Sequence, residues 1–274
     1  MDPFDKAVER ARIEGQGESI RSWISASSTD TTVEASLPQG RAVDLDPATL
    51  RDNLVLIDVS TPQQRLVADQ YRLLRTRVLQ LMKEKSQNLL GVTSPAPRAG
   101  KSLTAINMSI SISRTKGQSV VLVDADLRNP SVAEVLGIET QYGLIDFLAG
   151  TVGLEDVLVQ TDISGLSVIP GRRAGDIGDL PELLTSDRLR ALLGKMSQET
   201  GTFIVLDLPP VLVGADVISI SPLLHALLMV VHDGATQLDD LTKALQLLDG
   251  CNLLGTVLNQ SSEGQDKGGY GYGY

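Results

Sequence analysis

The sequence predicts an α/β fold built on a doubly wound, mainly parallel sheet. Short apolar runs alternate with stretches of helical periodicity along most of the chain, which is the order of strands and crossover helices in such a sheet. The apolar runs are continuous rather than alternating, as expected of strands covered on both faces. Right-handed crossovers would then bring ligand-binding residues to the carboxyl ends of the strands.

The expected elements begin with a long helix over residues 61–85, where leucine and valine recur at helical spacing and Pro62 suits the first turn. Strands and helices then alternate. The strands are expected at 88–93, 119–124, 166–170, 202–207, 226–232 and 253–258, and the helices at 101–116, 187–199, 216–223 and 237–248.

Composition divides the chain into three parts. Residues 15–42 are rich in Ser, Thr, Gly and Gln without a lasting apolar period, which indicates a linker. A short stretch at 5–12 is either a docking helix or a frayed terminus. We therefore expect an N-terminal segment with a flexible linker over 1–60, a main domain over 61–262 and a Gly/Tyr-rich tail over 263–274.

Charge and cysteine content exclude several classes of protein. The 274 residues carry a formal net charge of -10, which argues against a nucleic-acid partner because backbone phosphates attract clustered Lys and Arg. Cys251 is the single cysteine, so no disulfide forms within the chain, as is usual in a reducing compartment. No segment has the length of a membrane span, and the first residues lack the pattern of a secretory signal. These features predict a soluble, cytoplasmic protein.

A phosphate-binding loop is expected between the strand at 88–93 and the helix that follows it. Residues 94–102 read SPAPRAGKS, and Gly100, Lys101 and Ser102 stand where the helix begins. Backbone N–H groups at such a turn cradle phosphates, the lysine reaches the outer phosphates, and the hydroxyl coordinates Mg²⁺. The strict P-loop pattern has glycine where this chain has Pro95, so context rather than the motif alone supports the interpretation.

Acidic residues end two further strands of the predicted sheet. Asp124 and Asp126 follow the apolar run 120–123, and Asp207 follows the run 203–206. The carboxyl ends of parallel strands share one edge with the phosphate loop, where carboxylates hold Mg²⁺ directly or through water. One such acid could be an ordinary strand terminator or helix cap, but three at matching strand ends indicate a P-loop NTPase site for ATP and Mg²⁺.

Several motifs together resemble the bacterial tyrosine kinase family. Residues 94–102 resemble its deviant Walker A loop, VDADLR at 123–128 its Walker A′ motif, and LDLPP at 206–210 its Walker B motif. DQYRLLRT at 69–76 resembles its Glu-x-x-Arg-x-x-Arg assembly motif, with Asp for Glu. The resemblance covers roughly residues 60–274 and further includes 136–150, 181–184 and 255–259.

The resemblance implies a protein-tyrosine autokinase with specific roles at the matching positions. Lys101 would stabilise the transferred phosphoryl group, and Asp124 would orient or deprotonate the acceptor hydroxyl. Ser102, Asp126 and Asp207 would hold Mg²⁺ or its waters. Contacts to the nucleotide would come from Pro97, Arg98, Ala99, Gly100, Lys101, Ser102, Leu103 and, at the adenine, Asn259.

The tail supplies the acceptor in this interpretation. Three of the five tyrosines, Tyr270, Tyr272 and Tyr274, fall within the last five residues and are separated by glycines. The resemblance implies their autophosphorylation, whereas composition alone also fits a Gly/Tyr low-complexity tail. Each phosphate adds about -1.5 to -2 charges, so modification of a chain already at -10 would loosen an assembly by repulsion.

Transfer between subunits favours a homo-oligomer, such as the ring that the resemblance implies. Asp69, Arg72 and Arg75 would then meet a neighbour's site, although composition alone also fits a solvated helix face. The resemblance further implies regulation of exopolysaccharide synthesis and export, with a membrane polysaccharide co-polymerase as activator, recruitment to the inner membrane face, and other protein substrates.

Arg98 departs from the family pattern because it replaces a glycine of the loop. A glycine there has freedom at positive φ and permits close backbone approach. Arg98 therefore either strains the loop and weakens nucleotide binding or adds a phosphate contact. Two alternative functions stay open: a partitioning or septum-positioning ATPase of the same fold, whose additional loop lysine is absent here, and a catalytically weak nucleotide-binding regulator.

Overall fold

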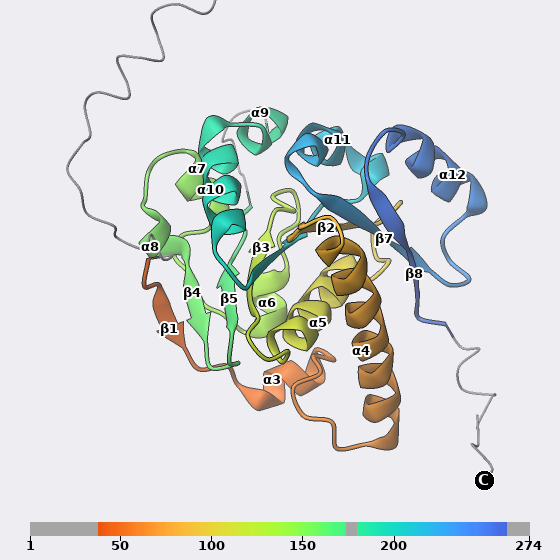
Figure 1. Ribbon diagram of the computed structural model, residues 1–274, viewed down its shortest axis with the longest axis horizontal. Coiled ribbons are helices and arrows are strands. Elements are labelled where there is room, and N and C mark those ends of the chain that lie inside the picture. Colours follow the sequence, from red (N-terminus) through yellow and green to blue (C-terminus); the bar gives the residue numbers. More distant parts are fainter. Residues whose placement is uncertain (1–37, 174–179, 262–274) are drawn as a thin grey trace, which may run out of the picture. The chain divides into compact units, whose positions relative to one another are not determined.

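The computed structural model describes residues 38–173 and 180–261, and an eight-stranded sheet runs through this part of the chain (Figure 1). The strand order is β1-β4-β5-β3-β6-β2-β7-β8, and every neighbouring pair is parallel except β4 with β5. The strands are β1 Arg41–Val43, β2 Leu89–Thr93, β3 Ser119–Asp124, β4 Val159–Thr161, β5 Leu166–Ile169, β6 Thr202–Asp207, β7 Ala226–His232 and β8 Leu253–Asn259.

Helices cover both faces of the sheet. The described helices are α3 Pro47–Asp52, α4 Pro62–Lys83, α5 Lys101–Ser113, α6 Val132–Leu136, α7 Leu144–Leu148, α8 Leu154–Val157, α9 Leu180–Leu184, α10 Asp187–Gln198, α11 Asp216–Ile220 and α12 Leu238–Leu247, with 3₁₀ turns at η1 Val211–Val213 and η2 Ser221–Leu223. In the described ranges no helix combines the length and the apolarity needed to cross a membrane.

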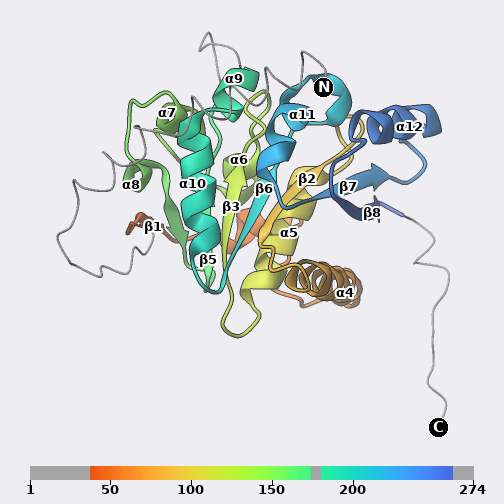
Figure 2. The same cartoon turned by 45° about the horizontal axis from the view of Figure 1, so that its top comes forward.

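The sheet separates two hydrophobic cores because successive side chains of a strand point to opposite faces. In β3, Val121 and Val123 belong to the core under α7, α8, α10, α11 and α12, whereas Val120 and Leu122 belong to the core under α3, α4, α5 and α6. In Figure 2 the helices α4 and α5 lie side by side and α10 lies apart from them. This burial on both faces explains the continuous apolar runs of the central strands.

The long helix α4 begins where the sequence predicts. Thr61 is its N-cap and forms a reciprocal capping box with Gln64, while Pro62 occupies the first turn. The helix ends at Lys83, two residues before the predicted end. Strands β3, β6 and β7 have the predicted bounds, and β2, β5 and β8 differ by one residue at one end.

The predicted N-terminal segment over 1–60 needs correction in its described part. Residues 41–43, placed at the end of the linker and beyond it, form β1, and residues 47–52 form α3. Leu50 and Val55 are buried in the core on the α5 face. The folded unit therefore begins upstream of residue 61, because isolated apolar side chains are buried by tertiary contacts that periodicity does not reveal. Residues 5–12 lie outside the described ranges.

Candidate active site

Three central strands end side by side at one edge of the sheet. Asp124 and Asp207 are register partners on the neighbouring strands β3 and β6, and Val92 of β2 pairs with Asp207 from the other side. The loop that follows β2 therefore lies next to both acids. This arrangement follows from parallel pairing, which puts the carboxyl ends of these strands at one edge.

The loop between β2 and α5 is held by backbone and side-chain hydrogen bonds. Val211 N donates to Ser94 O at 2.8 Å, and Asn259 Nδ2 donates to Ala99 O at 2.9 Å. Gly100 has φ 84°, and a Cβ added there would lie 2.1 Å from Asn259 Nδ2. Gly100 is therefore required both for its left-handed backbone and for the close approach of Asn259.

Arg98 adopts the conformation that makes it unusual in this loop. Its φ is 65°, in the left-handed region that favours glycine. The side chain is exposed and has no hydrogen-bond or ion-pair partner in the described part of the chain. The loop thus keeps the backbone shape of a glycine at a position occupied by arginine, and it carries an unengaged guanidinium.

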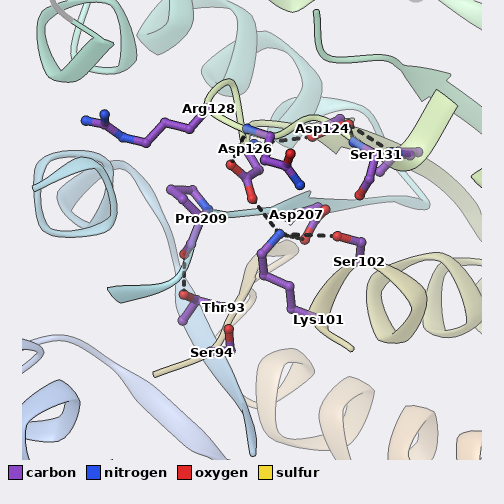
Figure 3. A network of polar contacts seen from close by, with 12 residues as sticks. Thr93, Ser94, Lys101, Ser102, Asp124, Asp126, Arg128, Ser131, Asp207 and Pro209 are labelled. Carbon is purple, nitrogen blue, oxygen red and sulfur yellow. Dashed lines mark hydrogen bonds and ion pairs between the residues drawn. The ribbon is translucent and has the colours of Figure 1, made fainter. Parts of the chain in front are cut away.

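Lys101 lies at the centre of the site (Figure 3). Its side chain is 10% exposed, and its Nζ lies 2.7 Å from Asp126 Oδ2 and 3.3 Å from Asp207 Oδ1. Nζ also lies 3.2 Å from Ser102 Oγ. Burial opposes the charge of Lys101, but attraction to Asp207 and Asp126 outweighs it and raises the pKa of the amine. The lysine is therefore a fixed cation between two carboxylates.

Asp207 keeps one oxygen without a partner. Its side chain is fully buried, and Oδ2 accepts no hydrogen bond from the described residues. Burial raises the pKa of Asp207, although Lys101 and Ser102 favour its charged form. A buried polar atom without a partner is costly, so this oxygen points to a ligand that completes the site.

The Asp124 side chain is fully buried, and backbone N–H groups donate to both of its carboxylate oxygens. Its Oδ2 accepts hydrogen bonds from Ser131 N and Val132 N, both at 3.0 Å, and its Oδ1 accepts from Asp126 N at 3.3 Å. The carboxylate thus satisfies N–H groups at the start of α6. Burial, reinforced by the nearby charge of Asp207, raises the pKa of Asp124 to about 8.

The donor set at this edge fits Mg²⁺ held together with a nucleotide. In the described ranges no group of three or more His, Cys, Asp or Glu side chains could hold a metal by itself. Asp126, Asp207 and Ser102 supply only hard oxygen donors, and one carboxylate oxygen is unpartnered. Mg²⁺ is typically bound by one or two carboxylates together with substrate phosphates and water. The residues present therefore fit such an ion as part of a nucleotide complex.

The structure brings most of the predicted site residues together and separates the rest. Residues 97–103, Asp124, Asp126 and Asp207 lie at one sheet edge, with Asn259 of β8 bonded to the loop. Asp69 and Arg72 form an ion pair on α4, where both side chains are more than half exposed. Arg75 Nη1 donates to Ser111 O of α5 at 2.9 Å. The predicted acceptors Tyr270, Tyr272 and Tyr274 lie outside the described residues.

Two polar contacts that support this edge of the sheet were not predicted from the sequence. Arg128 makes a bidentate ion pair with buried Asp216 of α11, at 2.5 and 3.1 Å. Arg172 makes another with Asp146 of α7, at 2.8 and 2.5 Å. The first pair joins residues 88 positions apart and the second joins residues 26 positions apart, so only the folded structure reveals them.

Gly171 is a third feature that the sequence analysis missed. A Cβ added at Gly171 would lie 2.9 Å from Cγ of Asp124 and 2.8 Å from Cβ of Pro130. The backbone of this segment therefore closes over the Asp124 carboxylate, and only glycine permits the approach. A glycine directly after the predicted strand 166–170 was the one available signal.

Comparison with curated proteins finds several tyrosine-protein kinases. No family model matches the chain. Tyrosine-protein kinase ptk of Acinetobacter johnsonii is 31% identical over 196 residues, which are 71% of this chain and 26% of that protein. Tyrosine-protein kinase YwqD of Bacillus subtilis is 28% identical over 215 residues, 77% of this chain and 89% of that protein. The chain thus spans about a quarter of ptk but most of YwqD.

Solved structures give the same picture. The kinase domain of Escherichia coli tyrosine kinase ETK superposes with a TM-score of 0.65 at 27% identity, over 76% of this chain and 80% of that one. The chimerical protein CapA2B2 gives a TM-score of 0.68 at 25% identity, over 82% of this chain and 95% of that one. The septum site-determining protein MinD of Pyrococcus horikoshii, complexed with Mg-ADP, gives a TM-score of 0.51 at 22% identity, over 64% of this chain and 72% of that one. This is a likeness of fold alone.

Proposed function

The chain belongs to the family of bacterial tyrosine kinases, and on that premise we propose that it is an ATP- and Mg²⁺-dependent protein-tyrosine autokinase. The observation that carries the proposal is the position of Lys101. A buried ammonium at the start of α5 lies within 3.3 Å of two strand-end carboxylates, one of which keeps an unpartnered oxygen. Phosphoryl transfer depends mainly on positioning and charge neutralisation, which this arrangement supplies.

The proposed reaction moves the γ-phosphoryl group of ATP to a tyrosine. The phenolic oxygen forms a bond to the γ-phosphorus, the bond from that phosphorus to the β,γ-bridging oxygen breaks, and ADP leaves with the electron pair. Lys101 would stabilise the charge on the transferred group from its fixed place between Asp126 and Asp207.

Magnesium fits the same residues. Ser102, Asp126 and Asp207 would hold the ion or its waters, and the unpartnered Oδ2 of Asp207 is the oxygen most readily available to coordinate it. Bound with the nucleotide, the ion would neutralise charge on the phosphate oxygens. Residues 97–103 would surround those phosphates, and Asn259, which bonds to the loop through Ala99, would contact the adenine.

Asp124 would take or orient the proton of the acceptor hydroxyl. A free tyrosine has a pKa near 10, and a carboxyl whose pKa is raised to about 8 is a stronger base than an ordinary aspartate. Its Oδ1 accepts a single described hydrogen bond, from Asp126 N, and so retains a lone pair. Because Asp124 is fully buried, an acceptor reaches it only if the segment around Gly171 moves.

The acceptors would be Tyr270, Tyr272 and Tyr274 of the tail, which the sequence supports through their clustering and glycine spacing. Among the described residues, Tyr71 and Tyr142 are both partly buried, which makes them poorer acceptors. We further propose transfer between subunits of a homo-oligomer, with Asp69, Arg72 and Arg75 of α4 facing a neighbour's site.

The wider role follows from the family. We propose that the kinase regulates exopolysaccharide synthesis and export, that a membrane polysaccharide co-polymerase activates it at the inner membrane face, and that tail phosphorylation loosens the assembly by adding negative charge. Other protein substrates would use the same site. The relative from Klebsiella pneumoniae that is named a putative tyrosine-protein kinase in the cps region is consistent with this role.

A nucleotide-binding regulator without transfer activity is the second candidate, and Arg98 is the observation that favours it. A side chain at φ 65° in the phosphate loop implies strain where the family has glycine. The likeness to septum-type ATPases extends to the fold alone.

Incubation with ATP and Mg²⁺ tests the proposal. Phosphatase-treated protein, Lys101→Ala and the control Lys195→Ala, an exposed lysine on α10, are compared by intact mass and site mapping. We expect phosphate on the tail tyrosines in the parent and in Lys195→Ala, and a loss of about 100-fold or more in rate in Lys101→Ala. A parent that binds ATP yet stays unmodified with its activator present would favour the regulator.

A further inference from the structure

A cavity lies between α4 and α5, away from the strand ends. Its volume is about 240 Å³, and its α5 lining starts at Asn107 and ends at Arg114. These residues are six to thirteen positions beyond Lys101, which at 1.5 Å per residue is about 9–20 Å along the helix. The cavity is therefore separate from the nucleotide site. Its polar lining consists of Tyr71, Arg72, Arg75, Asn107, Ser111 and Arg114.

Three guanidinium groups line this one cavity. Arg72 and Arg75 come from α4, and Arg114 follows the last turn of α5. Arg75 donates one hydrogen bond to Ser111 O at 2.9 Å, and Arg114 donates one to Ile57 O at 2.7 Å. A guanidinium carries five N–H donors, so both retain donors beyond these contacts.

The cluster has an excess of positive charge. Among the described residues, Asp69 is the one carboxylate within ion-pair distance of these three arginines, and it pairs with Arg72 on the exposed side of α4. Burial and then the charge of Arg72 lower the pKa of Arg114, so the guanidiniums are close enough to repel. A chain with a net charge of -10 thus concentrates cations at this place.

The remaining polar groups of the cavity wall are fixed by their own hydrogen bonds. Asn107 Oδ1 accepts from Leu56 N at 2.8 Å, and Asn107 Nδ2 donates to Leu54 O at 3.3 Å. Ser111 Oγ donates to Tyr71 O at 3.4 Å. These contacts preorganise that part of the wall, and the arginine N–H groups are the charged donors left for a ligand.

We propose that this cavity binds a phosphate-class dianion, either inorganic phosphate or the phosphate of a small monoester, through Arg72, Arg75 and Arg114. Guanidinium forks match phosphate oxygens in geometry as well as charge. The volume of about 240 Å³ is several times the roughly 30 Å³ share of one water, so it admits such an anion with some of its hydration. The site goes beyond the proposed kinase activity and does not depend on turnover. Because Arg72 and Arg75 are also the residues proposed to face a neighbouring subunit, the binding experiments use a protein concentration at which light scattering shows a monomer.

Calorimetric titration of inorganic phosphate at constant ionic strength tests the site. Arg75→Ala and Arg114→Ala are each expected to weaken binding about tenfold or more, since each removes hydrogen bonds to a charged ligand. Arg77→Ala, an exposed arginine on α4 outside the cavity lining, is the matched control and should bind as the parent does. The phosphate affinity of Arg114→Lys should lie between those of the parent and Arg114→Ala, because lysine keeps the charge but lacks the forked guanidinium.

Lys101→Ala separates the two sites, since it removes phosphate binding at the nucleotide loop and leaves the cavity unchanged. Phenyl phosphate, sulfate and acetate are titrated in parallel. Tighter binding of phenyl phosphate identifies a monoester ligand, and equal binding identifies free phosphate. The proposal would be overturned if the parent did not bind phosphate, or if only Lys101→Ala lost phosphate binding. It would also be overturned if Arg77→Ala weakened phosphate binding as much as Arg114→Ala does, or if the parent bound acetate as tightly as phosphate.

Hydrogen exchange on the parent keeps the proposal testable even if an arginine variant does not fold. Saturating phosphate, compared with chloride, is expected to slow amide exchange in the α4 and α5 segments that line the cavity. Unchanged exchange in both segments contradicts a bound anion there.

Discussion

Replacing Arg98 by glycine is expected to stabilise the folded chain. Arg98 has φ 65°, and the left-handed conformation costs a residue with a Cβ about 1–2 kcal/mol. Glycine removes that cost but gives the unfolded chain more freedom, which offsets about 0.5–1 kcal/mol. The expected net gain in the free energy of unfolding is about 0.5–1 kcal/mol, or about 1–4 °C in Tm for a domain of this size.

Arg98→Ala is the matched control because alanine keeps the Cβ and loses only the guanidinium. The Arg98 side chain is exposed and has no hydrogen-bond or ion-pair partner in the described ranges. Its removal should therefore leave the free energy of unfolding within about 0.5 kcal/mol of the parent. Guanidinium chloride denaturation of the parent and both variants measures this difference. Equal stability of Arg98→Ala and Arg98→Gly, or a destabilised Arg98→Gly, would refute the strain interpretation.

Nucleotide affinity of the same variants distinguishes the two interpretations of Arg98. If the guanidinium contacts phosphate, both variants bind ATP more weakly by a similar factor. If strain weakens the loop, Arg98→Gly binds ATP more tightly than Arg98→Ala does. Isothermal titration with MgATP measures both constants.

Two further predictions concern the backbone over Asp124 and the salt bridge beside it. Gly171→Ala should lower the free energy of unfolding by about 1–3 kcal/mol, because its Cβ would lie 2.9 Å from Cγ of Asp124. The control Gly194→Ala should not lower it, because its Cβ would meet no neighbouring group within 4 Å. Equal denaturation midpoints of the two variants would contradict this. Burial alone would raise the pKa of Asp146, but hydrogen bonding to Arg172 outweighs it and lowers that pKa. Its stabilisation is therefore complete above the unfolded pKa near 4 and is lost as pH falls through the folded value. The difference in unfolding free energy between the parent and Asp146→Asn should be constant from pH 6 to 8 and shrink below pH 4, and a difference unchanged at pH 3 would contradict the assignment.

The central strands were predictable because burial on both faces leaves an uninterrupted apolar run. Strand β3 is such a case, with every residue after the first buried. Strands β1 and β4 escaped prediction because each has three residues and each is paired with a strand distant in sequence, Arg41 with Val159. A strand of three residues is too short for a period to be recognised.

The carboxylates of the site were predictable, but their hydrogen bonds were not. The ends of the predicted strands are enough to put Asp124 and Asp207 at one edge of a parallel sheet, where the structure has them. Which oxygen is occupied depends on the packing of α6 and on the loop after β2. The structure has Asp124 accepting N–H groups at the start of α6, and it has Asp207 keeping one oxygen free of partners in the described chain. No local pattern encodes that difference, because each partner comes from another element.

The arginine-lined cavity shows how packing changes the meaning of a charged helix face. Arg72 and Arg75 on α4 read as solvated surface when that helix is considered by itself. Packing against α5 brings Arg114 beside them, 39 positions after Arg75 in the chain. Repulsion among these three cations, of which Arg75 is partly buried, opposes folding, and Asp69 relieves it only at Arg72. Stability alone gives no reason to gather these charges in so acidic a chain, whereas an anion bound among them would turn the repulsion into attraction.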